Sequence, residues 1–178
     1  MTRIGSVTNV FRWFVKSCFV LPFVLSAGNS EAQTKNSDPI ILFAEADPQM
    51  NAAISSARAT ISYFHAAVKA NAGTEYMFKA AIPYGDNSGV EHVWVMFEDG
   101  TDGKYAGTLT NSPQFVDLKV GDQIEIGFGN VSDWAYYTSE GKLVGAYTIR
   151  VMVPQMNKED QDYFSQTLSE KVEGVLYD

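Results

Sequence analysis

Six short segments with the composition of β-strands follow one another between residues 75 and 153, and no helix-forming stretch separates them. Val, Ile, Phe, Tyr and Trp are concentrated in these segments, and Gly, Asp, Asn and Pro lie between them, which is typical of strands joined by turns. A parallel pair of strands needs a long crossover, usually a helix. The sequence therefore predicts a mainly antiparallel sheet of five to six short strands: 75–82, 90–97, 104–110, 123–129, 133–138 and 143–153.

A helix is expected on each side of this sheet. Asp47 can cap a first helix and Pro48 fits its first turn, and apolar residues then recur at spacings of three and four until Asn71 ends the pattern. Asn157 opens a final helix. The residues on its apolar face are expected to be Phe164, Leu168, Val172 and Val175. Together these patterns predict an α+β fold in a single domain over residues 45–178.

The first 32 residues are typical of a secretory signal peptide. Basic residues precede the apolar run CFVLPFVLSA (18–27), and small residues around Ala32 suit cleavage after it. The run is too short to span a bilayer, so no stable membrane insertion is expected after cleavage. A lipoprotein anchor is the alternative, but no apolar stretch precedes Cys18, as that anchor requires. We therefore expect a periplasmic or secreted protein with a loose mature tail over residues 33–44.

Charge, cysteine and histidine content limit the partners and cofactors. Removing the three basic residues and one acidic residue of the signal peptide from 13 basic and 21 acidic residues leaves 10 and 20, a formal charge of −10. Nucleic acids bind basic surfaces, so nucleic-acid binding is excluded. The single cysteine leaves with the signal peptide, and the two histidines, His65 and His92, belong to no spaced ligand motif. No disulfide, metal site or cofactor is therefore expected.

Two adjacent titratable residues, Glu91 and His92, lie in the expected strand 90–97. Successive side chains of a strand point to opposite faces, so the two would form a catalytic pair only if a bulge re-aimed one of them. Trp94 and Met96 would share the face of His92 and pack in a core, with a hydrogen-bonded His92 at its edge. The pattern favours a structural role over acid-base catalysis.

A hairpin is expected over residues 133–150, with a two-residue turn at Glu140-Gly141 that fixes the register. Trp134 would then lie opposite Tyr147 on an aromatic face that buries against a helix, with Gly145 leaving room for a ring. The members of this face are Trp134, Tyr136, Leu143, Tyr147 and Ile149.

The other face of the hairpin would carry a polar cluster. The same register sets Asp133 opposite Thr148 and makes Arg150 its diagonal neighbour, within reach of a long side chain. Two interpretations stay open: an ion pair that supports the sheet, which the pattern favours, or part of a binding site.

Five ordered motifs carry a family resemblance: EHVWV (91–95), GTLTNSP (107–113), LKVGD (118–122), SDWAY (132–136) and GAYTIR (145–150). Together they resemble the YegJ-like family of uncharacterised bacterial domains, over about residues 45–170. The resemblance implies a small α+β domain, often exported, with no activity to carry over to particular residues. The polar motif residues that packing explains least form the candidate ligand-binding set: Glu91, His92, Asn111, Asp133, Thr148 and Arg150.

We expect a non-enzymatic exported module that binds a protein or a small-molecule ligand across one face of the sheet, because this acidic scaffold carries no recognisable catalytic set. The alternative is an envelope hydrolase that uses Glu91 or Asp133 as a base, with His92 or Arg150 stabilising charge. A third hypothesis is an immunity-like inhibitor of a secreted toxin.

Overall fold

The computed structural model describes residues 47–86 and 89–173, which all lie in one compact unit. The expected signal peptide, its cleavage point and the mature tail lie outside the described residues. Within the described ranges, no helix has the length and apolar content needed to cross a membrane.

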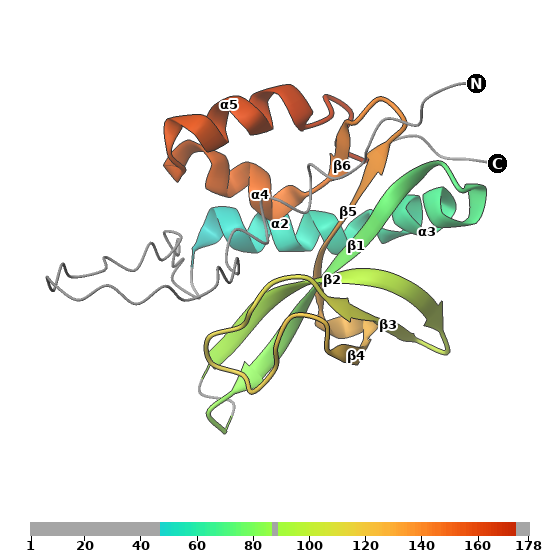
Figure 1. Ribbon diagram of the computed structural model, residues 1–178, viewed down its shortest axis with the longest axis vertical. Helices are drawn as coiled ribbons and strands as arrows, with labels where there is room; N and C mark the ends of the chain where they lie inside the picture. The colour runs from blue at the N-terminus through green and yellow to red at the C-terminus, as the bar shows by residue number, and fades with distance from the viewer. Residues whose placement is uncertain (1–46, 87–88, 174–178) are drawn as a thin grey trace, which may run out of the picture. The chain divides into compact units, whose positions relative to one another are not determined.

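One six-stranded antiparallel sheet organises the unit, in the spatial order β4-β3-β2-β1-β5-β6. Figure 1 shows β4 and β6 at opposite ends of the sheet, with α4 and α5 on the β6 side. The predicted α+β class and the mainly antiparallel sheet are confirmed. The strands are β1 (Gly73–Tyr84), β2 (Gly89–Thr101), β3 (Lys104–Leu109), β4 (Gln123–Gly127), β5 (Val131–Thr138) and β6 (Leu143–Gly145).

The N-terminal helical segment is two helices, α2 (Pro48–Ala59) and α3 (Ile61–Ala70), where the periodicity predicted one. Asp47 caps α2 as expected, with its Oδ1 accepting from the amides of Gln49 at 2.9 Å and Met50 at 2.8 Å. The break lies at Thr60, whose Oγ1 donates to the Ser56 carbonyl at 2.8 Å. A hydroxyl that bonds back to the preceding turn competes with the backbone ladder and bends a helix.

The predicted strand 143–153 is wrong beyond Gly145. The strand β6 stops there, Ala146 takes a left-handed backbone conformation with φ of 54°, and the chain turns into helix α4 (Tyr147–Met152). The short helices η1 (Phe128–Asn130) and η2 (Val153–Gln155) precede β5 and follow α4. A run of β-branched residues fits a strand by propensity, but here tertiary contacts with β5 decide the conformation.

The register of the β5–β6 hairpin also differs from the prediction by one residue. The amide of Thr138 donates to the Lys142 carbonyl at 2.8 Å, so three residues form the loop, and Gly141 supplies a positive φ of 74°. Tyr136 therefore pairs with Val144 and not with Gly145. A slip of one residue moves each side chain of one strand to the other face relative to its partner.

The last helix, α5 (Lys158–Thr167), begins as predicted but ends early. The Asn157 side chain accepts from the Asp160 amide at 3.0 Å and caps the helix. Beyond the helix, Leu168 forms a parallel bridge to Leu143 of β6, so the C-terminal segment lies along the sheet edge. Val172 is therefore not helical, and the expected Val175 lies outside the described residues.

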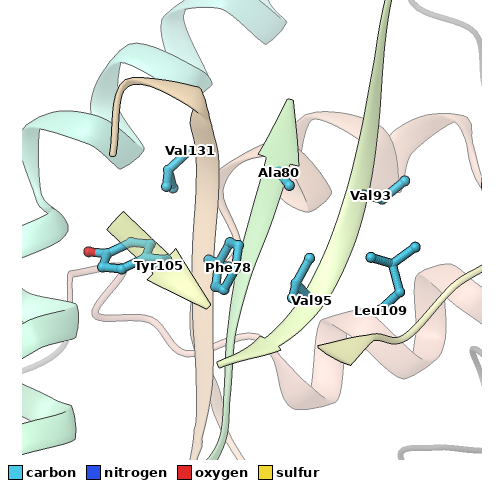
Figure 2. Packing of buried hydrophobic residues seen from close by; sticks show 7 residues of the cluster. All are labelled: Phe78, Ala80, Val93, Val95, Tyr105, Leu109 and Val131. Carbon is cyan, nitrogen blue, oxygen red and sulfur yellow. The ribbon is translucent and has the colours of Figure 1, made fainter. Parts of the chain in front are cut away.

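The first face of the sheet carries the apolar core. Figure 2 shows one cluster on β1, β2, β3 and β5, made of Phe78, Ala80, Val93, Val95, Tyr105, Leu109 and Val131. A second cluster packs Trp134 and Tyr136 of β5 against Phe64 of α3, which confirms that these two rings bury against a helix. Val144, and not the predicted Leu143, belongs to this cluster, because Leu143 pairs with Tyr137. A side chain at Gly145 would begin 2.6 Å from the Trp134 ring, so this glycine leaves room for the ring as expected.

Candidate functional site

The second face of the sheet carries a buried polar cluster where β2, β1 and β5 lie side by side. The register pairs Lys79 of β1 with Trp94 of β2 on one side and with Asp133 of β5 on the other. Thr148 of α4 completes the cluster. Lys79 is 9% exposed, Trp94 5%, Thr148 2% and Asp133 0%. Such burial of a cation and a carboxylate is rare unless each has partners.

The ammonium of Lys79 has few partners for a buried charge. Its Nζ donates to Thr148 Oγ1 at 3.1 Å and lies 5.4 Å from the centre of the Trp94 ring. Burial lowers the pKa of Lys79, while the charge of Asp133 acts to raise it. The two ion pairs within 4.0 Å in the described part of the chain involve other lysines, Lys104 and Lys158. Lys79 is thus desolvated without a direct counter-ion.

Lys79 is not among the site residues predicted from the sequence. The available signal was its place as the only charged residue in the apolar run YMFKAAI (76–82). A single lysine in such a run reads as a solvent-facing position of a half-buried strand. Helix α4 covers this part of the second face and makes the position buried.

The carboxylate of Asp133 is fully engaged by hydrogen bonds. Its Oδ1 accepts from the amides of Trp134 at 2.8 Å and Tyr147 at 3.1 Å. Its Oδ2 accepts from Thr148, at 2.7 Å from the amide and 2.7 Å from Oγ1. Burial raises the pKa of Asp133, while the Thr148 hydroxyl and the Lys79 charge lower it. Because both oxygens only accept, the arrangement suits an ionised carboxylate that holds the first turn of α4 on β5.

Thr148 connects the two charged groups. Its hydroxyl oxygen accepts a hydrogen bond from Lys79, and its hydroxyl proton is donated to Asp133. One hydroxyl therefore bridges the ammonium and the carboxylate. The structure therefore brings Asp133 and Thr148 together as predicted, although from a strand and a helix rather than from two paired strands.

The predicted contact between Arg150 and Asp133 is absent from the described residues. Arg150 lies on α4, where its Nε donates to the Gly145 carbonyl at 3.0 Å and its Nη2 to the Ser169 carbonyl at 3.0 Å. Burial lowers the pKa of Arg150, and the charge of Asp133 raises it, without an ion pair. Because Arg150 is helical, its guanidinium does not contact Asp133. It connects Gly145 of β6 with Ser169 of the C-terminal segment.

His92 lies at the outer end of the same face, where it is exposed. Its Nδ1 lies 2.8 Å from Ser132 Oγ, and Ser132 Oγ donates to the Lys79 carbonyl at 3.2 Å. Burial lowers the pKa of His92 to about 4, and the charges of Lys79 and Arg58 contribute to this lowering. Two basic groups therefore act on this imidazole.

The side chains of Glu91 and Asn111 hold backbone segments. Glu91 pairs with Ile82 while His92 pairs with Ala81, so the two neighbours point to opposite faces as predicted. The Glu91 carboxylate accepts from the amides of Gln114, Phe115 and Val116, at 2.5, 2.8 and 3.2 Å. Asn111 Oδ1 accepts from the Trp94 amide at 2.7 Å.

No group of three or more His, Cys, Asp or Glu residues that could hold a metal ion occurs within residues 47–86 and 89–173.

A family model described as "Uncharacterized protein conserved in bacteria (DUF2314)" matches residues 47–169. The chain belongs to this family. A similar relative is the "Uncharacterized protein YegJ" of Escherichia coli (strain K12), which is 29% identical over 143 residues, covering 80% of this chain and 89% of that protein. No solved structure matches the chain significantly. The DUF2314 match includes all six strands, so the whole Lys79 cluster lies inside the family domain.

Replacing Glu91 of this DUF2314 domain with alanine should release the segment 114–116. Hydrogen bonds to a charged group stabilise a fold by about 1.5 to 3 kcal/mol. We expect the free energy of unfolding to fall by an amount near the lower end, because the bonds from Gln114 and Phe115 to Glu91 are solvent-exposed. Hydrogen exchange should accelerate at the amides of residues 114–116. Glu125→Ala, which removes an exposed ion pair on β4, is the matched control and should leave them unchanged. Unchanged exchange in Glu91→Ala would contradict the assignment.

Proton NMR of the two histidines should detect the basic surroundings of His92. We expect its Hε1 signal to titrate with a pKa near 4, and Lys79→Met or Arg58→Gln to raise that pKa, because each removes a positive charge. Since the pKa of His92 in the folded protein lies below 6.5, its ordinary value, this residue should reduce folding stability as the pH falls from 6.5 toward 4. His65→Gln assigns the signals, and a His92 pKa at its ordinary value would refute the expectation.

Proposed function

We propose that the protein is an exported, non-enzymatic binding module whose ligand contacts the outer part of the second face, next to His92. The observation that carries the proposal is Lys79, a buried ammonium without a direct counter-ion on a sheet face that opens toward solvent at His92. Burying an ammonium costs several kcal/mol. Strongly perturbed charges of this kind cluster at functional sites.

The inner part of this face, around Lys79, is covered, whereas the outer part, around His92, is accessible to solvent. Thr148 of α4 covers the inner part, and Tyr163 of α5 lies 3.2 Å from the hydroxyl of Tyr137 on β5. Alternate residues of a strand share one face, so Pro83 of β1 and Val90 and His92 of β2 lie on the second face with Lys79 and Trp94. These three residues lie toward the β1–β2 turn, and all three are exposed. Val90 retains 44% of its surface. A ligand can therefore combine apolar contact with polar contact there.

The hydrogen bonding of the two carboxylates supports binding over hydrolysis. A general base must be within reach of the proton it removes and free to accept it. Glu91 is occupied by three loop amides, and Asp133 is buried under α4 with its oxygens bonded. These are the acids that an envelope hydrolase would have used as a base.

Native mass spectrometry of the protein purified from the periplasm or medium of its host tests the proposal. We expect a noncovalent small-molecule adduct that is lost in His92→Gln and retained in His65→Gln, because these two variants remove the same group from different surfaces. An adduct that survives both changes, or none in the wild type, contradicts a ligand site at His92. A bound protein chain in its place would support the immunity-like alternative.

Export is proposed from the basic residues, the apolar run 18–27 and the small residues around Ala32. The expected secreted species begins at Gln33 and carries no lipid. Intact mass measurement decides this point, and a species that retains residues 1–32 or has a diacylglycerol on Cys18 would overturn it.

A further inference from the structure

We propose that the site beside His92 accepts the anionic group, a carboxylate or a phosphate, of a small molecule. This inference rests on the binding function proposed above and specifies the chemistry of its ligand. It starts from three basic residues that contact the first residues of β5: Arg58 of α2 and His92 of β2 through their side chains, and Lys79 of β1 through its main-chain carbonyl.

Hydrogen bonds at two consecutive residues of β5 link these three residues. Arg58 Nε donates to the Val131 carbonyl at 2.7 Å. The next residue, Ser132, contacts His92 Nδ1 at 2.8 Å and donates to the carbonyl of Lys79 at 3.2 Å. The β1–β5 register shifts between Lys79 and the following residue, which is the point where Ser132 is inserted. A bulge of this kind commonly re-aims side chains next to a functional site.

The charged groups that act on His92 are basic, although the whole chain is acidic. The charges of Lys79 and Arg58 lower the pKa of His92, in addition to its burial. Asp133 of β5 acts on Lys79 but is bonded to α4, and Glu91 points to the opposite face. The formal charge of −8 is that of the whole chain. At physiological salt, charges beyond about 8 Å are largely screened, so distant acidic residues contribute little at this site.

The donors that an oxyanion needs are accessible at this site. Arg58 and His92 are both exposed. Arg58 uses its Nε on Val131, and its planar guanidinium has four further N–H donors suited to a carboxylate or phosphate. A lysine in place of this arginine would supply charge but not the fork.

The hydrogen bonds of Ser132 determine which nitrogen of His92 carries the proton. The hydroxyl has one proton, which it donates to the Lys79 carbonyl, so it accepts from Nδ1–H of His92. In the neutral ring Nε2 then holds a lone pair. A bound oxyanion offsets the Lys79 and Arg58 charges, so we expect His92 to take up a proton and donate to the ligand from Nε2. Ligand binding and protonation of His92 are thereby coupled.

Titration with inorganic phosphate tests this inference, with His92 Hε1 as the NMR signal. We expect a saturable shift with a Kd on the order of millimolar, as suits an ion of five heavy atoms. The pKa of His92 should rise from about 4 toward 6.5 at saturation. Acetate is titrated separately to distinguish carboxylate from phosphate binding. Potassium chloride at equal ionic strength should give no saturable shift, and the His65 signal should not respond.

Two variants that each remove one positive charge show whether phosphate binding depends on Arg58. Arg58→Gln should weaken phosphate binding about tenfold, the size of one lost charge-assisted hydrogen bond. Lys104→Gln removes one positive charge from an exposed ion pair on β3 and should retain wild-type affinity. Arg58→Lys keeps the charge and serves as a second variant if Arg58→Gln has a shifted unfolding transition. Equal affinities in Arg58→Gln and Lys104→Gln, or no response of the folded wild type to either anion, would overturn the inference.

The failure of this inference can be told apart from failure of the binding function. If native mass spectrometry finds a neutral or cationic adduct that depends on His92, while phosphate and acetate do not bind, the anionic chemistry is wrong and the binding module stands. If no adduct and no anion response are found, both proposals are wrong.

Discussion

Asp133→Ala should lower the free energy of unfolding by about 3 to 5 kcal/mol, the range observed when one partner of a buried charged network is removed. Two losses combine in this variant. The amides of Tyr147 and Thr148 at the start of α4 lose their acceptor, and the Lys79 ammonium stays buried without the compensating charge. Chemical denaturation of the wild type and the variant measures the difference.

A double-mutant cycle with Lys79→Met separates the two losses. Lys79→Met alone should cost less than Asp133→Ala, because Asp133 keeps its four hydrogen bonds when the buried ammonium is replaced by an apolar chain of similar length. In the Lys79→Met background, Asp133→Ala should cost less, with a coupling of about 0.5 to 3 kcal/mol. Additive effects would mean that Asp133 acts on α4 alone, and a loss below about 1 kcal/mol for Asp133→Ala would contradict its burial in the network.

Trp134→Ala should cost a similar amount, about 3 to 5 kcal/mol, for a different reason. The indole is fully buried, its Nε1 donates to the Ala57 carbonyl at 2.9 Å, and its ring lies 5.9 Å from Phe64 and 5.8 Å from Tyr147, centre to centre. The substitution leaves a cavity between β5 and α2 and an unpaired carbonyl. Denaturation in urea measures the loss.

The control for Trp134→Ala is Val120→Ala, at a residue that is 43% exposed. Surface substitutions of this kind usually stay within about 0.5 kcal/mol. Trp134→Phe, which keeps most of the ring volume, should lie between the two. If Trp134→Ala and Val120→Ala unfold at the same urea concentration, Trp134 does not hold the helices on the sheet.

The sequence allowed most of the sheet to be predicted because its signals are local. Asp47 and Asn157 cap their helices through side chains two or three residues from the amides they bind. The first five strands follow from composition and turn residues. Thr60 interrupts the first helix through a hydroxyl contact that periodicity of apolar residues does not contain.

Helix α4 could not be predicted because its cause lies elsewhere in the chain. The segment after Gly145 has strand propensity, and it becomes helical where the Asp133 carboxylate accepts its first amides and Ala146 adopts a left-handed conformation. The candidate site could be predicted only in part, for the same reason. Asp133 and Thr148 could be placed together, but the burial of Lys79 depends on α4, so the residue that carries most of the electrostatics was missed.

The strand order has a consequence for how the chain folds. Strands β1 to β4 are neighbours in both sequence and space, and the β1–β2 and β2–β3 hairpins close over short loops, 85–88 and 102–103, with small entropic cost. Strand β5 must instead return from the end of that meander to pair with β1, after which β6 and the C-terminal segment can add. Such distant pairings slow folding. We therefore expect the Lys79 cluster, which needs β5 and α4, to assemble after β1 and β2 have paired with each other.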